Sequence, residues 1–239
     1  EPLPGSLSTP ISPPMIFASC LEMASPRPVP PYWRVVEAST WLKDWNRNSF
    51  YNETRLPWVL PSPNMPTLQT AIVYPGMVLA EALNLSEGRG TTVPFELFGA
   101  PFIDPEKLKK NLDARKIPGC VFRKHSFIPT FNKYHGLYCN GIQIHVTEPE
   151  IYYPVATALE IFDAIIDTSP ENSLGFKDPP YEYEYKLMPF DILSGDSLMR
   201  TSLLRRDPVK WEKQRWREEI EVFRKEFAHL AVYPDQRDN

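Results

Sequence analysis

Proline is the residue type that most restricts how this chain can fold. The chain has 27 prolines among its 239 residues, and residues 1–31 hold a dense share of them. Each proline fixes the backbone angle φ and removes a hydrogen-bond donor, so a proline-rich stretch stays extended instead of forming a helix. The sequence therefore predicts an extended segment over residues 1–34 and a folded domain over residues 35–239.

A second group of prolines lies early in the expected domain. Residues 56–67 contain four of them, which makes this stretch too stiff for a helix and too poor in donors for a central strand. We expect a rigid loop here, with Thr67 as the cap of a helix that starts at Leu68. A helical pattern also occurs at residues 35–45, where Val36, Trp41 and Trp45 can share a face.

Three further helices are indicated by caps and by apolar spacing. Asp104 followed by Pro105 is a strong helix start, and Pro118 with Gly119 is expected to end that helix. Residues 155–167 and 208–230 also show helical periodicity. The residues expected to be buried are Leu108 and Leu112 in the first helix, Val155, Leu159, Phe162 and Ile166 in the second, and Trp216, Ile220, Phe223, Phe227 and Leu230 in the third.

Two strands are expected at residues 121–128 and 141–147. The second strand alternates, with Ile142, Ile144 and Val146 on one face and Gln143, His145 and Thr147 on the other. His145 is therefore expected to point away from the core. Together with the helices, these strands predict a single α+β domain with a small mixed or antiparallel sheet flanked by helices.

Charge and hydropathy argue against two classes of partner. The formal net charge is −4 and the pI is about 5.7, without a basic stripe interleaved with aromatic residues, so nucleic-acid binding is not expected. No apolar run reaches the length of roughly 18–20 residues that spans a bilayer. We expect no membrane span.

Cysteine and histidine spacing does not indicate a metal site. Cys20, Cys120 and Cys139 do not form a Cys-x-x-Cys pair, although a bridge between Cys120 and Cys139 stays open. Three histidines recur at ten-residue intervals, which fits no known ligand spacing. Neither a metal nor another cofactor is expected.

The run Ser-Glu-Gly-Arg-Gly-Thr-Thr at residues 86–92 is the strongest candidate for a functional loop. It has neither the Gly-Lys-Ser/Thr of a phosphate loop nor the Gly-x-Gly-x-x-Gly of a dinucleotide site. Its two glycines permit a tight turn that presents Glu87 and Arg89 to a small polar ligand. A surface turn with a local ion pair between these two residues explains the pattern equally well.

Carboxylates are better catalytic candidates than serine or cysteine, since no Gly-x-Ser-x-Gly elbow is present. Glu81, Glu87 and Glu96 lie in or beside the glycine loop, and glycoside hydrolysis uses a pair of carboxyl groups. A carboxylate beside an arginine stays ionised, so Glu87 would act as a base or nucleophile if it pairs with Arg89. Farther along, tyrosine alternates with glutamate up to residue 185, which suggests an extended segment with one aromatic face, packed on the domain or lining a groove.

Several of these motifs together resemble the carboxy-terminal half of the bacterial NamZ (YbbC-like) family. They are the proline loop at 56–67, Val-Tyr-Pro-Gly at 73–76, Asn-Leu-Ser-Glu-Gly-Arg-Gly-Thr-Thr at 84–92, Pro-Phe-Glu-Leu at 94–97 and Gly-Ala-Pro at 99–101. The likeness continues through residues 129–134, 139–141, 144–147 and 180–184, and covers roughly residues 40–233. It implies an exo-β-N-acetylmuramidase, which removes N-acetylmuramic acid from the non-reducing end of peptidoglycan fragments. A periplasmic or secreted location is also favoured by the resemblance.

The resemblance places a muramic acid site around the glycine loop. Glu87 would be catalytic, and Arg89 would grip the lactyl carboxylate of the sugar. The other substrate-binding residues expected are Asn64, Tyr74, Asn84, Thr91, Thr92, Glu96, Lys133 and His145. Departures from the family pattern include Val93, where an arginine is usual.

The family also has a Rossmann-like amino-terminal half, which residues 1–40 are too short and proline-rich to supply. The expected partners are therefore a peptidoglycan-derived sugar and a Rossmann-like domain or separate chain. An alternative stays open, in which the chain is a non-catalytic carbohydrate-binding or assembly domain.

Overall fold

The computed structural model describes residues 56–230, all of which belong to one compact unit of the chain. The expected proline-rich segment at residues 1–34, the helical pattern at residues 35–45 and Cys20 lie outside the described residues.

A three-stranded antiparallel sheet forms the centre of the described domain. The strands β1 (Leu97–Ala100), β2 (Cys120–Lys124) and β3 (Asn140–Val146) have the order β1-β3-β2. Leu97 pairs with Gln143 across β1 and β3, and Cys120 pairs with Val146 across β2 and β3. The predicted α+β fold with a small antiparallel sheet is confirmed. Strand β1 was not expected, because all four of its residues are buried and it shows no alternation.

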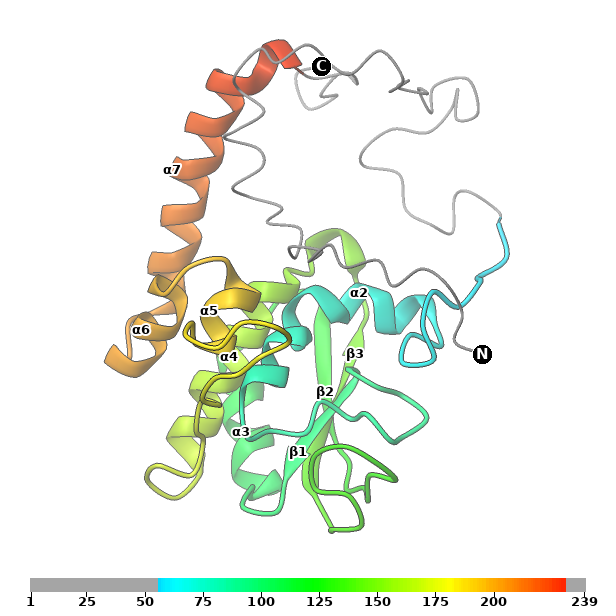
Figure 1. Ribbon diagram of the computed structural model, residues 1–239. Coiled ribbons are helices and arrows are strands. Elements are labelled where there is room, and N and C mark those ends of the chain that lie inside the picture. The colour runs from blue at the N-terminus through cyan, green and yellow to red at the C-terminus, as the bar shows by residue number, and fades with distance from the viewer. Residues whose placement is uncertain (1–55, 231–239) are drawn as a thin grey trace, which may run out of the picture. The chain divides into compact units, whose positions relative to one another are not determined.

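Helices pack on the face of the sheet that carries Ile142 and Ile144, both fully buried. They are α2 (Leu68–Met77), α3 (Pro105–Arg115) and α4 (Pro154–Thr168). Helix α4 contacts both α2 and α3, and Figure 1 shows α3 and α4 together beside the strands. Helix α4 buries Leu159 and Phe162 as predicted. Since α4 has neighbours on two sides, its buried face is wider than the predicted stripe and also includes Ala158, Ile161 and Ile165, whereas Val155 and Ile166 are only partly buried.

Both predicted helix caps are confirmed. The side chain of Thr67 accepts a hydrogen bond from the backbone amide of Thr70 at the start of α2. Asp104 accepts from the amides of Glu106 and Lys107 at the start of α3, and these bonds lower the pKa of its carboxyl group. Helix α3 ends at Arg115, earlier than predicted, because Lys116 adopts a left-handed conformation.

Strand β2 is shorter than predicted. It ends at Lys124, and farther along only Phe127 pairs with Cys139 in an isolated bridge. Cys120 and Cys139 are both buried and not joined in a disulfide, and burial raises the pKa of each thiol to about 11. A thiol with a raised pKa stays protonated and unreactive at neutral pH.

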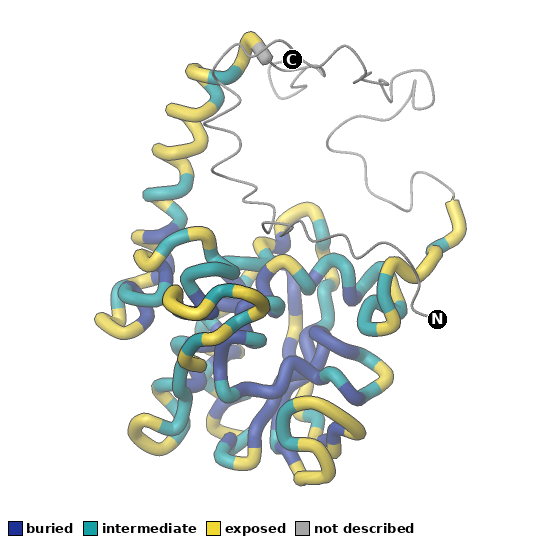
Figure 2. Tube along the Cα trace, in the orientation of Figure 1, coloured by how far each residue is buried: buried dark blue, intermediate teal, exposed yellow. Residues whose placement is uncertain are grey.

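The carboxy-terminal part of the described chain is helical. After α4 the chain forms α5 (Pro189–Ser194), α6 (Leu198–Arg205), α7 (Val209–Phe227) and η5 (Ala228–Leu230). Two other short elements lie earlier in the chain, η3 (Val78–Ala82) directly after α2 and η4 (Pro149–Ile151) just before α4. The prediction of a buried stripe along α7 was wrong for Ile220 and Phe223, which are 47% and 51% exposed. Trp216 packs partly against the core, but later turns of α7 are largely exposed, as Figure 2 shows. Within residues 56–230, no helix combines the length and the apolar character needed to cross a membrane.

Candidate functional site

The glycine loop is anchored to the sheet instead of lying free on the surface. Ser86 exchanges two backbone hydrogen bonds with Gly99 of β1, at 2.9 and 3.0 Å. Gly90 has a φ of +82°, and a Cβ atom there would lie 2.7 Å from the backbone nitrogen of Thr130. Only glycine allows this close approach of two loops. Of the two interpretations left open by the sequence, the exposed turn is therefore not what the structure shows.

Glu87 lies inside this loop with a side chain that is only 1% exposed. Its Oε2 atom accepts a hydrogen bond from Lys133 Nζ at 2.8 Å, and its Oε1 atom lies 3.4 Å from Arg89 Nε. The expected ion pair between Glu87 and Arg89 is present. A second cation, brought in by residue 133, completes the neutralisation of this buried carboxylate, as a buried charge requires.

Lys133 uses all three of its donors within the protein. Besides Glu87, Nζ donates to the backbone carbonyls of Ala80 at 2.7 Å and Leu85 at 2.8 Å. Burial lowers the pKa of Lys133 from 10.5 to about 8, although the carboxylate of Glu87 opposes this shift. Lys133 therefore ties three segments of the chain together from within, and has no donor left for a ligand.

The pH dependence of stability should reveal the titration of Lys133. Between its folded pKa of about 8 and its ordinary value of 10.5, the unfolded chain binds more protons on this amine than the folded chain does. Stability should therefore rise with pH through this window, and that gain should be lost as pH falls through 8. We expect the difference in unfolding free energy between wild type and Lys133→Met to grow in favour of wild type from pH 8 to pH 10 in urea titrations. A difference that shrinks over this range would contradict the assignment.

Arg89 is the cation of the loop that reaches the surface, with 27% of its side chain exposed. Its Nη2 atom donates to Glu81 Oε1, and its guanidinium carbon lies 5.3 Å from the ring centroid of Phe95. The Phe95 ring in turn meets Tyr74 edge to face at 4.9 Å. Phe95 has a φ of +64°, a costly conformation for a bulky residue, held in part by its amide, which donates to the carbonyl of Glu87 at 2.6 Å. The Phe95 ring therefore forms a floor below the guanidinium, and Tyr74 supports that ring from its edge.

Tyr181 joins this group from the segment that was expected to be extended. That expectation was wrong, since Tyr181 and Glu184 exchange two backbone hydrogen bonds and close a tight turn. The hydroxyl of Tyr181 donates to Glu81 Oε2 at 3.0 Å. Burial, followed by the nearby Glu81 carboxylate, raises the pKa of Tyr181, so this hydroxyl keeps its proton.

The five linked residues form what we call the charge chain, in the order Tyr181, Glu81, Arg89, Glu87 and Lys133. Arg89, in the middle of the charge chain, is 27% exposed and Glu81 is 16% exposed, so a ligand can reach these two residues but not Glu87. Sequence reasoning included Glu81 as a neighbouring carboxylate but missed Tyr181. A contact across 100 residues leaves no signal in local spacing.

Three other residues expected at the site hold the surrounding loops. Glu96 is buried, and its Oε1 atom accepts hydrogen bonds from the hydroxyls of two threonines at the start of α2. The amide side chain of Asn84 bonds to the backbone of Ser173 and Gly175 at 2.7 and 2.8 Å. Thr91 donates to the carbonyl of Gly88 at 2.6 Å. Their polar groups are used within the protein.

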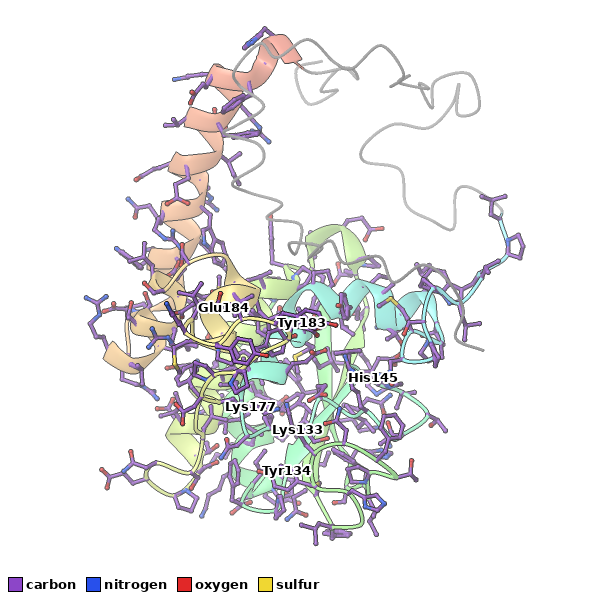
Figure 3. The ribbon with its side chains drawn as sticks, in the orientation of Figure 1. Lys133, Tyr134, His145, Lys177, Tyr183 and Glu184 are labelled. Atoms are coloured by element: carbon purple, nitrogen blue, oxygen red, sulfur yellow. The ribbon has the colours of Figure 1, made fainter. Side chains whose placement is uncertain are left out.

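The remaining expected residues are not joined to the charge chain by a hydrogen bond within residues 56–230. Thr92 is exposed. Asn64 lies in a turn where its backbone amide donates to the side-chain hydroxyl of Ser62. His145 is on β3, on the face opposite the main core as predicted, and its buried Nε2 atom has no hydrogen-bond partner. Figure 3 shows His145 apart from Lys133 and Tyr134. No group of three potential metal ligands occurs among the described residues.

Comparisons with known proteins agree on one family. The model of the family described as "Exo-beta-N-acetylmuramidase NamZ, C-terminal" matches residues 72–233. The chain is 43% identical over 163 residues to the peptidoglycan beta-N-acetylmuramidase NamZ of Bacillus subtilis (strain 168). This match covers 68% of the chain and 37% of the relative, so the chain spans well under half of that relative's length.

Solved structures of two DUF1343 family proteins from Bacteroides fragilis share the fold. The first has a TM-score of 0.65 at 22% identity, over 80% of this chain and 49% of that protein. The second has a TM-score of 0.50 at 21% identity, over 74% of this chain and 44% of that protein. With the long family match and the close relative in Bacillus subtilis, the conclusion is that this chain belongs to the NamZ family and corresponds to its carboxy-terminal region.

Proposed function

We propose that this domain forms the N-acetylmuramic-acid-binding wall of a glycoside hydrolase that acts on the non-reducing end of peptidoglycan fragments. The observation that carries the proposal is the outward guanidinium of Arg89, held above an aromatic floor in a domain of the NamZ family. Arginine binds carboxylates through two parallel hydrogen bonds, and N-acetylmuramic acid differs from most sugars by its carboxylate. The partly buried ring of Tyr74 suits the apolar face of a sugar, whereas Phe95 is buried and supports Arg89 from below.

In this proposal Glu87 is the base or nucleophile. Its carboxylate is covered in the structure described here, and the contact with Arg89 Nε at 3.4 Å lacks hydrogen-bond geometry. When a ligand carboxylate draws Arg89 outward, this weak contact is the one that breaks, and Glu87 becomes reachable. Glu81 is the carboxylate already accessible beside Arg89. Tyr74 and Thr92 are proposed sugar contacts, because their side-chain hydroxyls have no hydrogen bond within residues 56–230.

A second candidate function is supported by two observations. The chain spans 37% of the length of its Bacillus subtilis relative, and Glu87 is almost fully covered. Both suit a domain that binds the sugar without turnover, or that assembles with a separate Rossmann-like half which supplies the remaining catalytic groups.

The test is turnover of a chromogenic β-N-acetylmuramide by the full chain. We expect turnover, and we expect Glu87→Gln to lower it by roughly 10²–10⁴-fold, the range for loss of an acid or base group. The exposed Glu171 supplies a matched control, Glu171→Gln, which should keep wild-type activity. Full activity of Glu87→Gln would remove this residue from the chemistry. Binding of N-acetylmuramic acid without turnover by wild type would favour the second candidate.

A further inference from the structure

We propose that Tyr181 and Glu81 are positioning residues that aim the guanidinium of Arg89 at a ligand carboxylate, and so make the site discriminate N-acetylmuramic acid from uncharged N-acetylglucosamine. This inference rests on the proposed function and assigns its sugar specificity to two residues outside the glycine loop.

The guanidinium of Arg89 is fixed on one side and open on the other. Nη2 donates to Glu81, Nε is buried against Glu87, and the Phe95 ring lies beneath the plane. Nη1 makes no hydrogen bond to the part of the chain that the structure describes. The open edge therefore offers Nη1 and the second hydrogen of Nη2, the fork that fits a carboxylate.

Glu81 sets the direction of this fork. Its contact with Nη2 is a direct hydrogen bond, whereas the contact of Glu87 with Nε is not. The partly exposed Glu81 carboxylate would be able to rotate if nothing held it. The hydroxyl of Tyr181 holds its other oxygen at 3.0 Å, so the orientation passes from Tyr181 through Glu81 to Arg89.

Charge alone does not explain how this site would recognise an anion. In the charge chain, two carboxylates balance two cations, so attraction of a ligand carboxylate depends on where the donors of Arg89 point. A guanidinium that points its donors at the ligand raises the affinity for a sugar with a carboxylate and does not raise the affinity for a sugar without one. The hydroxyl of Tyr181 should therefore change the ratio of affinities more than it changes the fold.

Tyr181→Phe removes only the hydroxyl, and Tyr183 provides the matched control. Tyr183 lies in the same turn but is 81% exposed, so Tyr183→Phe changes the same atom without touching the charge chain. Affinities of the full-length wild type and both variants for N-acetylmuramic acid and N-acetylglucosamine would be measured by calorimetry. Thermal melts would check that each variant is folded.

We expect the preference of wild type for N-acetylmuramic acid to fall about tenfold in Tyr181→Phe, as for the loss of one hydrogen bond to a charged group. Tyr183→Phe should keep the wild-type preference. If Tyr181→Phe is folded and keeps that preference, the positioning role is overturned while the proposed function stands. If wild type itself does not prefer N-acetylmuramic acid, both the proposed function and this inference are overturned.

Discussion

Lys133→Met should destabilise the domain by about 3–5 kcal/mol, the cost expected when one partner of a buried ion pair is removed. The reason is the number of groups that depend on this amine. The buried carboxylate of Glu87 and the carbonyls of Ala80 and Leu85 all accept from Nζ. Methionine fills most of the volume but donates no hydrogen bond, so three acceptors each lose one hydrogen bond at once, although Ala80 O still accepts from the amide of Leu83. Urea denaturation followed by circular dichroism would measure the loss.

Two further variants separate this effect from a general sensitivity to losing lysine. Lys110 is exposed on α3, and Lys110→Met should change the unfolding free energy by less than about 0.5 kcal/mol. The double variant Lys133→Met with Glu87→Gln removes both charges, so it should be more stable than Lys133→Met alone. A Lys133→Met protein as stable as wild type would show that Lys133 does not neutralise Glu87.

Gly90→Ala should cost about 3 kcal/mol or more, because two independent penalties act at this position. The left-handed φ of +82° disfavours any residue with a Cβ atom, by about 1–2 kcal/mol. The added carbon would also lie 2.7 Å from Thr130 N and 2.8 Å from Phe131 N, which are backbone atoms that cannot rotate away. The two loops would have to separate, and the hydrogen bond from Thr130 N to Gly90 O at 3.0 Å would be lost.

Gly195 is the control that isolates the backbone penalty. It has a similar φ of +87°, but a Cβ atom there would meet nothing within 4 Å. Gly195→Ala should therefore lose only the first penalty, about 1–2 kcal/mol. Equal losses in the two variants, measured by the same denaturation, would show that the packing of the glycine loop against residues 130–131 is not as described.

Local rules account for the parts of the fold that the sequence predicted. Thr67 and Asp104 cap their helices through contacts within three residues, and the alternation of β3 places Ile142 and Ile144 in the core. Strand β1 was missed because a short strand buried on both faces shows no periodicity. The buried stripe expected for α7 was wrong because spacing shows which residues share a face, but not whether anything covers it.

The candidate site shows the same limit in another form. The pair Glu87 and Arg89 was predictable, since the two residues are close in sequence. The contacts of Lys133 with Glu87 and of Tyr181 with Glu81 bridge 46 and 100 residues, and only the folded chain brings them together. The burial of Glu87 could not be predicted from the sequence either. A glutamate in a glycine loop is ordinarily exposed, whereas Glu87 is buried and pairs with two cations, Arg89 and Lys133.

Calorimetry on wild type and Arg89→Met would show whether Arg89 recognises the carboxylate of N-acetylmuramic acid. We predict that wild type binds N-acetylmuramic acid at least about tenfold more tightly than N-acetylglucosamine, and that Arg89→Met loses this difference while its affinity for N-acetylglucosamine is nearly unchanged. Equal affinities of wild type for the two sugars, or an undiminished preference in Arg89→Met, would show that Arg89 does not recognise the carboxylate.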